Sequence, residues 1–233
     1  GRRTIPLREV PLPHQCPRPV RMRVLARAPY FVGLSEAELD VVDRRMRAVS
    51  VPAGGYLYHA GDVADALFVV AEGVVKVAQL TPAGTETVTD ILVPGEVCGA
   101  VGTLGEPEHR QSATALVNSC VLRIGQDDFR GVLAGDARVG LRVLDDVADR
   151  LARAQADVGE TTETVAQRVA SVLLRLADKL GKDRGADGIL LEVPLSRADL
   201  AGLARSTPES VSRVMSRWKR AGIVDSGRRW TAL

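Results

Sequence analysis

The chain has 233 residues, of which 45% are hydrophobic and 26% are charged, and its formal net charge is +2 at pH 7. These values are ordinary for a soluble protein and allow two modest domains. No apolar run approaches the length of a membrane span, and the N-terminus lacks the apolar core of a signal peptide. We therefore expect a cytoplasmic protein without a membrane partner.

The small net charge conceals a strong polarity along the chain. Residues 1–27 contain seven Arg and one Glu, and residues 196–233 contain eight Lys or Arg and three acidic residues. Because the whole chain carries +2, residues 28–195 carry −9. An acidic middle beside a basic C-terminal segment predicts that only part of the molecule contacts nucleic acid.

The first segment in chain order, residues 1–22, contains five Pro residues among Arg residues. We expect an extended N-terminal arm, which either follows a DNA backbone or is a solvated tail. Residues 23–50 are predicted to be helical, with a capping box formed by Ser35 and Glu38.

From Val51 the hydrophobic period changes from 3.6 to 2 in six short segments, YLYH, ALFVVA, VVKVAQL, TETVTDILV, SATALV and CVLRI. Turn glycines separate them at intervals of ten to twelve residues. This spacing predicts an antiparallel β-roll in a domain of residues 23–135. Such a roll encloses a pocket near its irregular end, here the glycine-rich stretch 95–113, where backbone N–H groups can approach a bound group closely.

After Phe129 the helical period returns, and a long helix is predicted over residues 136–162. Its apolar residues recur in steps of three and four and form a heptad seam: Leu144, Val147, Leu151, Ala154 and Val158. One helix with such a seam needs a partner, and the simplest partner is its own copy. We therefore predict a parallel homodimer; the alternative is that the seam covers the roll within one subunit.

The last domain is predicted to span residues 163–233. It begins with an amphipathic helix over 163–181, followed by a loop over 181–188 and the strand ILLEVPL. Residues 194–222 then predict two short helices that meet at a sharp corner, and two short extended runs around Ser226-Gly227 predict a hairpin. Together these elements predict a winged helix-turn-helix.

The ends of these two helices have specific signals. Ser196 can cap the first helix, with Asp199 three residues later in a pattern close to a capping box. Thr207 can cap the second helix, with Pro208 at its first position, where the missing N–H costs nothing. Gly222 follows the last basic turn as a C-cap.

The second helix is amphipathic: Val211, Val214, Met215 and Trp218 are predicted to pack inward, which leaves short polar residues and Arg outward. A basic outward face in a helix-turn-helix favours DNA binding over a helical hairpin that only packs. The expected DNA contacts are Ser196, Arg197, Thr207, Glu209, Ser210, Ser212, Arg213, Arg217 and Lys219.

A jelly-roll-like sensor, a long dimer helix and a C-terminal winged helix-turn-helix, an α+β architecture, together resemble the CRP/FNR family of bacterial transcription regulators. The resemblance covers residues 24–233 and is most specific in VPLSRADLAGLARSTPESVSRVMSRWKRAGIV and LYHAGDVADALFVVAEGVVKV. It implies a regulator that binds palindromic double-stranded DNA as a homodimer, contacts RNA polymerase and responds to a signal in the roll.

In the recognition helix of this family, a Glu and a Ser-Arg pair three and four residues later contact base edges. The matching residues here are Glu209, Ser212 and Arg213. The position before the Glu is Arg in the cyclic-AMP receptor branch and Pro208 here. The resemblance to the FNR branch therefore implies a half-site like TTGAT rather than TGTGA.

The effector pocket departs further from the family pattern. Members that bind cyclic nucleotide have Gly-Glu early in the pocket loop and Arg-Ser/Thr-Ala later, where the Arg pairs with the phosphate. Here Gly99 is followed by Ala100, and the later run is Arg110-Gln111-Ser112-Ala113, with Gln at the expected Arg position unless the loop slips by one residue. The pair that reads the base from the dimer helix appears as Arg153-Ala154. These three mismatches argue against cyclic AMP.

The residues that bind cofactors elsewhere in the family also do not form their usual patterns in this chain. Cys16, Cys98 and Cys120 are too few for the four-Cys iron–sulfur cluster of FNR and too widely spaced for a disulfide framework. The candidate axial ligands for haem are Cys16, Cys98, His14, His59 and His109, none in a diagnostic pattern. A haem or redox gas sensor and an effector-independent regulator remain the alternatives.

Catalysis has no support in the sequence. The chain contains no Ser/His/Asp arrangement, no glycine-rich phosphate loop followed by Lys-Ser/Thr and no paired-His metal motif. We therefore predict neither an enzyme nor a metal site.

Overall fold

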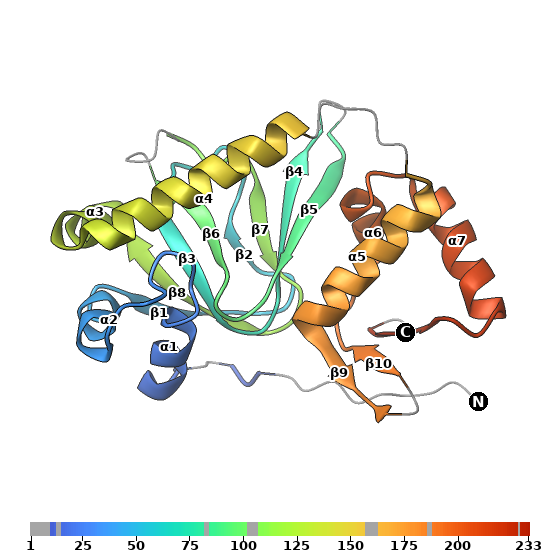
Figure 1. The fold of residues 1–233 in the computed structure, drawn as a ribbon, viewed down its shortest axis with the longest axis horizontal. Coiled ribbons are helices and arrows are strands. Elements are labelled where there is room, and N and C mark those ends of the chain that lie inside the picture. The colour runs from blue at the N-terminus through green and yellow to red at the C-terminus, as the bar shows by residue number, and fades with distance from the viewer. Residues whose placement is uncertain are drawn as a thin grey trace. The chain divides into compact units, whose positions relative to one another are not determined.

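The computed structural model describes residues 10–12, 15–81, 84–101, 107–156, 163–185, 188–227 and 229–233. The chain divides into two compact units (Figure 1). One unit contains the described residues of 11–75 and 92–162, and the other contains those of 76–91 and 163–233.

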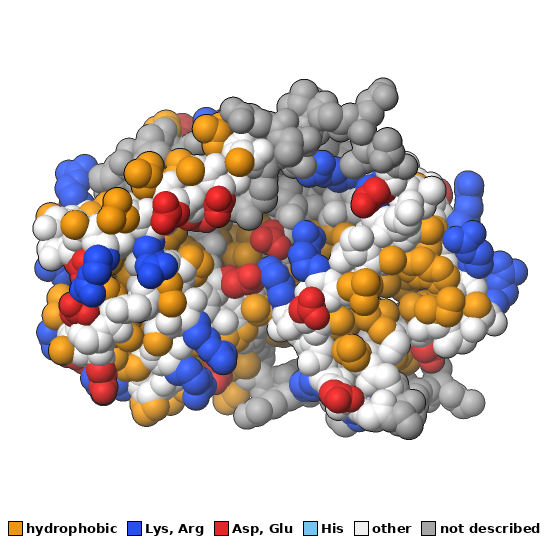
Figure 2. All heavy atoms as spheres, viewed as in Figure 1, with side chains coloured by type: hydrophobic (Ala, Val, Ile, Leu, Met, Phe, Trp, Pro, Cys, Tyr) orange, Lys and Arg blue, Asp and Glu red, His pale blue; other side chains and the backbone are white. Residues whose placement is uncertain are grey.

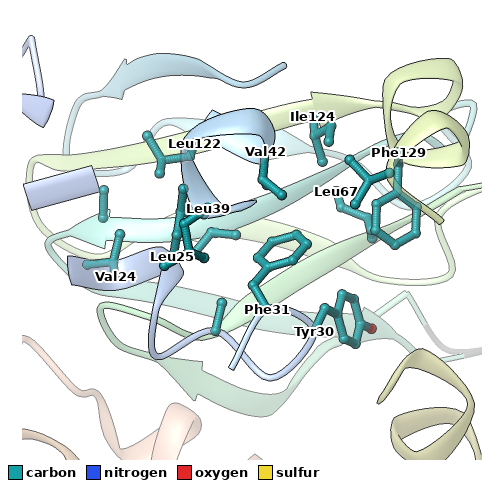
Figure 3. Close-up of a cluster of buried hydrophobic side chains, with 14 of the residues drawn as sticks. Val24, Leu25, Tyr30, Phe31, Leu39, Val42, Leu67, Leu122, Ile124 and Phe129 are labelled. Carbon is teal, nitrogen blue, oxygen red and sulfur yellow. The ribbon is translucent and has the colours of Figure 1, made fainter. Parts of the chain in front are cut away.

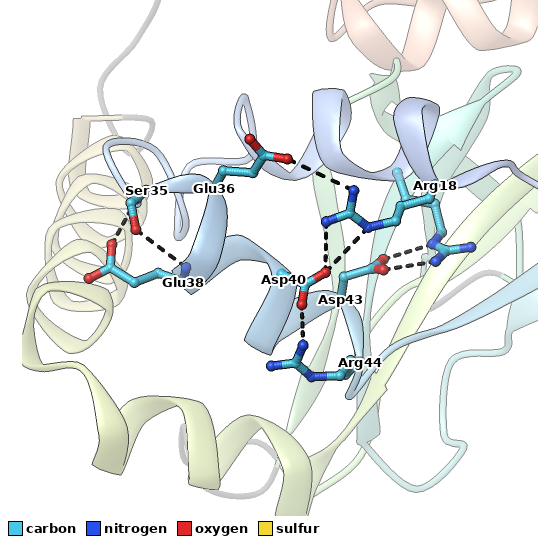
Figure 4. Close-up of polar contacts among 8 residues, drawn as sticks. Arg18, Ser35, Glu36, Glu38, Asp40, Asp43 and Arg44 are labelled. Atoms are coloured by element: carbon cyan, nitrogen blue, oxygen red, sulfur yellow. Dashed lines mark hydrogen bonds and ion pairs between the residues drawn. The ribbon is translucent and has the colours of Figure 1, made fainter.

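Two short helices open the first unit, α1 (Arg18–Leu25) and α2 (Glu36–Asp43). The capping box predicted for Ser35 and Glu38 is present, because each residue's side chain accepts a hydrogen bond from the backbone N–H of the other. Arg18 pairs with Asp40 at 2.8 Å, and Arg21 grips the buried carboxylate of Asp43 through two hydrogen bonds of 2.7 and 2.8 Å (Figure 4). These pairs fasten α1 to α2.

Two four-stranded antiparallel sheets form the roll, with strand orders β1-β8-β3-β6 and β2-β7-β4-β5. Nearly all of β4 and β5 lies in residues 76–91, which cluster with the second unit although the strands belong to the roll. In the first sheet, Val121 lies between Val49 on β1 and Val70 on β3. The bounds of the strands are β1 (Arg47–Val51), β2 (Tyr56–Tyr58), β3 (Asp65–Glu72), β4 (Val75–Leu80), β5 (Glu86–Leu92), β6 (Val97–Val101), β7 (Ser112–Ala115) and β8 (Ser119–Gly125). The roll predicted from the period of two is confirmed.

The core of the first unit lies where the N-terminal helices cover the first sheet. Apolar side chains of α1, α2 and the segment between them meet side chains of β3, β8 and the next helix (Figure 3). Phe31 and Phe129 are among the largest fully buried side chains. Burying side chains of this size is the main stabilising contribution that the unit makes, at roughly 1.5–3 kcal/mol each.

The structure corrects three local predictions in this unit. Residues 18–22, predicted as part of an extended arm, are helical, because Pro is favoured in the first turn of a helix and Pro19 lies there. Residues 47–50, predicted as helix, belong to β1, which pairs with the distant strand β8, for example Arg47 with Arg123. Residues 97–101, predicted as irregular, form β6 against β3. Both strands depend on long-range pairing.

Two helices complete the first unit, α3 (Gln126–Gly135) and α4 (Ala137–Ala156). Val139 and Val143 on α4 are buried, and Asp146 accepts a 2.7 Å hydrogen bond from the Tyr30 hydroxyl. The predicted long helix thus runs through residue 156, and residues 157–162 lie outside the described part of the chain.

The second unit contains a small sheet with strand order β11-β12-β10-β9 and three helices. Their bounds are α5 (Val165–Leu180), β9 (Gly181–Asp183), β10 (Ile189–Leu191), α6 (Arg197–Leu203), α7 (Pro208–Arg220), β11 (Asp225–Ser226) and β12 (Thr231–Ala232). β9 replaces part of the predicted loop 181–188, because Lys182 pairs in register with Leu190. Within the described ranges, no helix is long and apolar enough to span a bilayer.

Candidate DNA-binding surface

The first helix of the predicted reader, α6, begins at the residue that the sequence indicates. Ser196 Oγ accepts a hydrogen bond from the Asp199 backbone N–H at 3.0 Å, and the Asp199 carboxylate accepts one from the Ser196 backbone N–H at 2.8 Å. This reciprocal capping box satisfies two backbone donors that no helical carbonyl can reach. The start of α6 is therefore fixed by local chemistry.

The second helix, α7, also begins as predicted. Thr207 Oγ1 accepts a hydrogen bond from the Ser210 backbone N–H at 3.3 Å, and Pro208 occupies the first position. Gly222, with φ +71°, adopts the left-handed conformation that closes the helix. Val211 and Met215 are fully buried, which sets the rotation of α7 about its axis.

The opposite face of α7 is open to solvent and basic. Figure 2 shows Lys and Arg side chains gathered where α7 lies. Ser210 and Ser212 are half-buried, and the exposed residues of the helix are Pro208, Glu209, Arg213, Ser216, Arg217, Lys219 and Arg220. A Glu, two Ser and several Arg on one helix face can accept from a base amino group and donate to guanine or phosphate oxygens.

Two of the predicted DNA contacts have partners in the hairpin that follows α7. The guanidinium of Arg197 donates to Ser226 Oγ at 3.0 Å, and burial lowers its pKa from the usual value. Lys219 Nζ lies 2.6 Å from Asp225. Arg197 therefore ties α6 to the wing, and the charge of Lys219 is compensated. The sequence contains no signal for these pairs, because the partners lie six and 29 positions apart and meet only in the tertiary structure.

The corner between α6 and α7 involves an arginine that the sequence analysis missed. Arg168 on α5 donates to the carbonyl oxygens of Ala204 at 2.8 Å and Arg205 at 3.4 Å, and to that of Glu163 at 2.6 Å. Nothing in the sequence distinguishes Arg168 from Arg175, because both are cationic positions on the same amphipathic helix. Only the tertiary structure identifies the first as a corner contact.

In the roll, two of the predicted effector-pocket residues serve the fold. Gly99 has φ +93°, its N–H donates to Tyr58 Oη at 3.0 Å, and a Cβ there would lie 2.6 Å from the Ala66 carbonyl oxygen. Ser112 Oγ accepts a hydrogen bond from the Ala60 backbone N–H at 2.9 Å. The glycine is therefore required by the close approach of β6 to β3.

The other predicted pocket residues of the roll are partly open to solvent. Ala100 and Gln111 are half-buried, and Arg110 is exposed. Arg153 belongs to α4, but its side chain is outside the described part, as are residues 102–106 in the middle of the glycine-rich stretch. The structure therefore brings Gly99, Ala100 and the run 110–112 into one roll without defining a complete ligand site.

The candidate cofactor ligands are mostly buried. The thiols of Cys16 and Cys120 share a hydrogen bond, which lowers the pKa of Cys16 and raises that of Cys120. His109 is only 4% exposed and stacks on Tyr58 at 3.9 Å. His59 is exposed, and His14 lies outside the described residues. Across the described ranges, no three His, Cys, Asp or Glu residues are grouped as metal ligands.

The predicted dimer seam lies on the open side of α4. Leu144, Val147 and Leu151 are 62%, 45% and 59% exposed, and Leu141 adds a further apolar residue at 62%. Figure 2 shows hydrophobic side chains in a row where α4 lies. The side chain of Ala154 and the whole of Val158 lie outside the described part. Within one subunit, the described part of the seam is not covered.

Two family models match the chain. The cyclic nucleotide-binding domain matches residues 48–136, which include the roll, and the Crp-like helix-turn-helix domain matches residues 167–233. The matched segments contain, respectively, the predicted pocket residues of the roll and all the predicted DNA contacts.

Individual relatives extend over most of the chain. A cyclic AMP receptor protein of Thermus thermophilus is 29% identical, over 86% of this chain and 89% of the relative. A CRP-like cAMP-activated global transcriptional regulator of Mycobacterium tuberculosis is 24% identical, over 85% and 89%. The crystal structure of a putative cyclic nucleotide binding protein from Ruegeria pomeroyi is similar with a TM-score of 0.64 and 28% identity, over 91% of this chain and 92% of that chain.

Proposed function

This chain belongs to the CRP/FNR family of transcription regulators, which are DNA-binding proteins and not enzymes, and from this we infer that it binds a palindromic operator as a homodimer. The observation that carries the proposal is the exposed face of α7, where Glu209, Ser212 and Arg213 occupy successive turns above a buried apolar face. A helix with this polarity fits the major groove of DNA.

Each of these side chains has a proposed role at a base edge. The carboxylate of Glu209 accepts from a cytosine or adenine amino group, and the guanidinium of Arg213 binds O6 and N7 of guanine. Pro208 precedes Glu209, where the cyclic-AMP receptor branch has Arg. We therefore propose a TTGAT-like half-site. Ser196, Thr207, Ser210 and Arg217 are proposed to contact the sugar-phosphate backbone.

The homodimer rests on the seam of α4. An exposed row of leucines and valine on a 20-residue helix is a substantial apolar surface, and a parallel copy of the same helix buries it. A dimer also supplies two recognition helices, which a palindrome requires. Such a regulator acts in the cytoplasm on DNA and is proposed to contact RNA polymerase there.

The proposed signal is not cyclic AMP, although two relatives are named for it. Ala100 has no side-chain acceptor for a ribose hydroxyl, and the Gly99 N–H and the Ser112 hydroxyl oxygen already have partners in the roll. The same internal hydrogen bonds support the second candidate, a regulator that needs no effector. The buried His109 and the paired thiols of Cys16 and Cys120 keep haem or redox sensing as a third candidate.

Selection of binding sites from random DNA tests the proposal. We expect inverted repeats of a TTGAT-like half-site; a TGTGA half-site would refute the FNR-like interpretation of α7. Calorimetry with cyclic AMP separates the candidate signals, because micromolar binding would contradict the proposed pocket. An absorption spectrum of fresh protein, with and without air, distinguishes haem, a cluster and a colourless protein.

A further inference from the structure

The corner of the helix-turn-helix has an unusual residue at its tightest point. The Arg205 N–H donates to the Gly202 carbonyl at 3.1 Å, and the Ser206 N–H donates to the Ala201 carbonyl at 2.9 Å. This pair of hydrogen bonds is a Schellman motif, in which the residue after the C-cap is left-handed and usually Gly. Here that residue is Arg205, with φ +47°. A side chain at this conformation costs free energy that Gly avoids.

Arg168 offsets this cost from the neighbouring helix. The backbone bonds of the motif end on Ala201 and Gly202, whereas the guanidinium of Arg168 donates to the carbonyls of Ala204 and Arg205. These carbonyls lie at the negative end of α6, where a cation is favoured. The third hydrogen bond of the Arg168 guanidinium goes to the Glu163 carbonyl at 2.6 Å, just before α5 begins.

We propose that Arg168 is a positioning residue for DNA recognition: it holds the left-handed corner at Arg205 and thereby sets the direction in which α7 leaves α6. Only Ser206 and Thr207 separate Arg205 from the first residue of α7, so a shift in the corner turns the recognition helix. Because the bonds of Arg168 go to backbone carbonyls, its role is independent of which bases α7 reads.

This role rests on the proposed DNA binding and differs from a purely structural one in what it predicts. Loss of a general stabilising contact reduces the folded fraction and leaves the ratio of specific to non-specific affinity unchanged. Loss of a positioning contact reduces the ratio, because base contacts require accurate geometry whereas phosphate attraction does not.

The test compares DNA binding by full-length variants at one salt concentration, with the best site selected by the wild-type chain and with random duplex. Arg168→Ala removes all three hydrogen bonds. Arg168→Lys keeps the charge without the planar fork that serves three carbonyls. Arg205→Gly removes the backbone strain. Arg175→Ala is the control, because Arg175 is an exposed cation on the same helix.

We expect Arg168→Ala to lower the ratio of specific to non-specific affinity about tenfold, and Arg168→Lys to lower it by a smaller factor. Arg175→Ala should leave the ratio unchanged. Combining Arg205→Gly with Arg168→Ala should restore most of the ratio found for Arg205→Gly alone, because Gly adopts the corner without help. This double variant and Arg168→Lys also keep the test decisive if Arg168→Ala folds poorly.

An Arg168→Ala chain with the same ratio as Arg175→Ala would overturn the inference, and so would a double variant in which Arg205→Gly restores nothing. A wild-type chain that prefers no sequence would contradict the proposed function itself. The two failures are therefore distinguishable.

Discussion

At the scale of single residues, the exposed face of α7 separates two kinds of DNA contact. Arg213 lies one turn after Glu209, near the start of the helix, whereas Arg217 and Arg220 lie in its last turns. In a helix that enters the major groove with its N-terminal part, the first group meets base edges and the second meets phosphates.

Arg213→Ala is therefore expected to cost about 1–3 kcal/mol of binding free energy and to relax the preference at one base pair. Arg217→Ala should weaken all duplexes similarly and reduce the slope of log affinity against log salt by about one. Competition binding with single-base operator variants distinguishes the two. An unchanged base preference in Arg213→Ala would show that α7 is placed wrongly.

Lys219 is expected to contribute less than its charge suggests. Its ammonium is compensated by Asp225 at 2.6 Å, so Lys219→Ala should weaken binding less than Arg217→Ala does. The salt dependence of both variants, measured side by side, checks this. A larger loss for Lys219→Ala would mean that the pair opens when DNA binds.

His109 predicts a pH-dependent stability of the first unit. Burial lowers the pKa of this imidazole, against the opposing effect of the Asp65 and Asp62 carboxylates. The unfolded chain therefore binds a proton more readily, and the stability present above the usual His pKa is lost as the pH falls through the lower folded pKa.

His109→Phe keeps a ring against Tyr58 but cannot titrate. We expect urea unfolding to show a smaller loss of stability between pH 8 and pH 5 in this variant than in the wild-type chain. Because His59 is exposed, His59→Phe serves as the control for replacing an imidazole with a phenyl ring. If the unfolding free energy fell equally with pH in His109→Phe and in the wild-type chain, His109 would not be the cause of the pH dependence.

At the scale of elements, helix caps are the most reliable local signals in this chain. The boxes at Ser35 and Ser196 and the cap at Thr207 are where the sequence predicts them, because each depends on residues no more than three positions apart. Thr207→Ala should cost about 1 kcal/mol of unfolding free energy. Chemical denaturation, with the exposed mid-helix variant Ser216→Ala as the control, measures this. An equal loss of unfolding free energy in Thr207→Ala and Ser216→Ala would show that the Thr207 cap does not stabilise the chain.

Elements that depend on distant partners were not predictable in the same way. β1 and β6 pair with β8 and β3, far from them in the sequence, and β9 is a charged segment that becomes a strand only beside β10. The face of α7 follows from helical periodicity, whereas the partners of Arg197 and Lys219 and the corner contacts of Arg168 follow from tertiary structure. The roles of the predicted DNA and pocket residues remain predictions.

The seam of α4 gives a prediction about assembly. Replacing Leu144 and Leu151 with Glu should convert the dimer to a monomer, because two like charges would face their copies across a parallel interface. Sedimentation velocity measures the mass in solution. Leu174→Glu is a matched control, since Leu174 on α5 is 63% exposed and lies outside the seam. A monomeric wild-type chain would contradict the proposed homodimer.

In the whole molecule, the distribution of charge along the chain follows the elements that each part of the chain forms. The basic C-terminal segment forms the helix-turn-helix and its wing, and the residues of the roll and the long helix lie in the acidic part of the chain. This division supports a sensor that does not itself attract DNA and a reader that does. We propose that a signal in the roll alters how two α4 helices pack and thereby changes the spacing of the two recognition helices.

We propose that two copies of α7 enter successive major grooves of one palindrome. The most direct measurement is the affinity of the full chain for its selected operator with base pairs inserted between the half-sites. An insertion of about five base pairs rotates one half-site to the opposite side of the duplex and should abolish specific binding, whereas about ten should restore part of it. Affinity that is indifferent to the spacing would contradict the account.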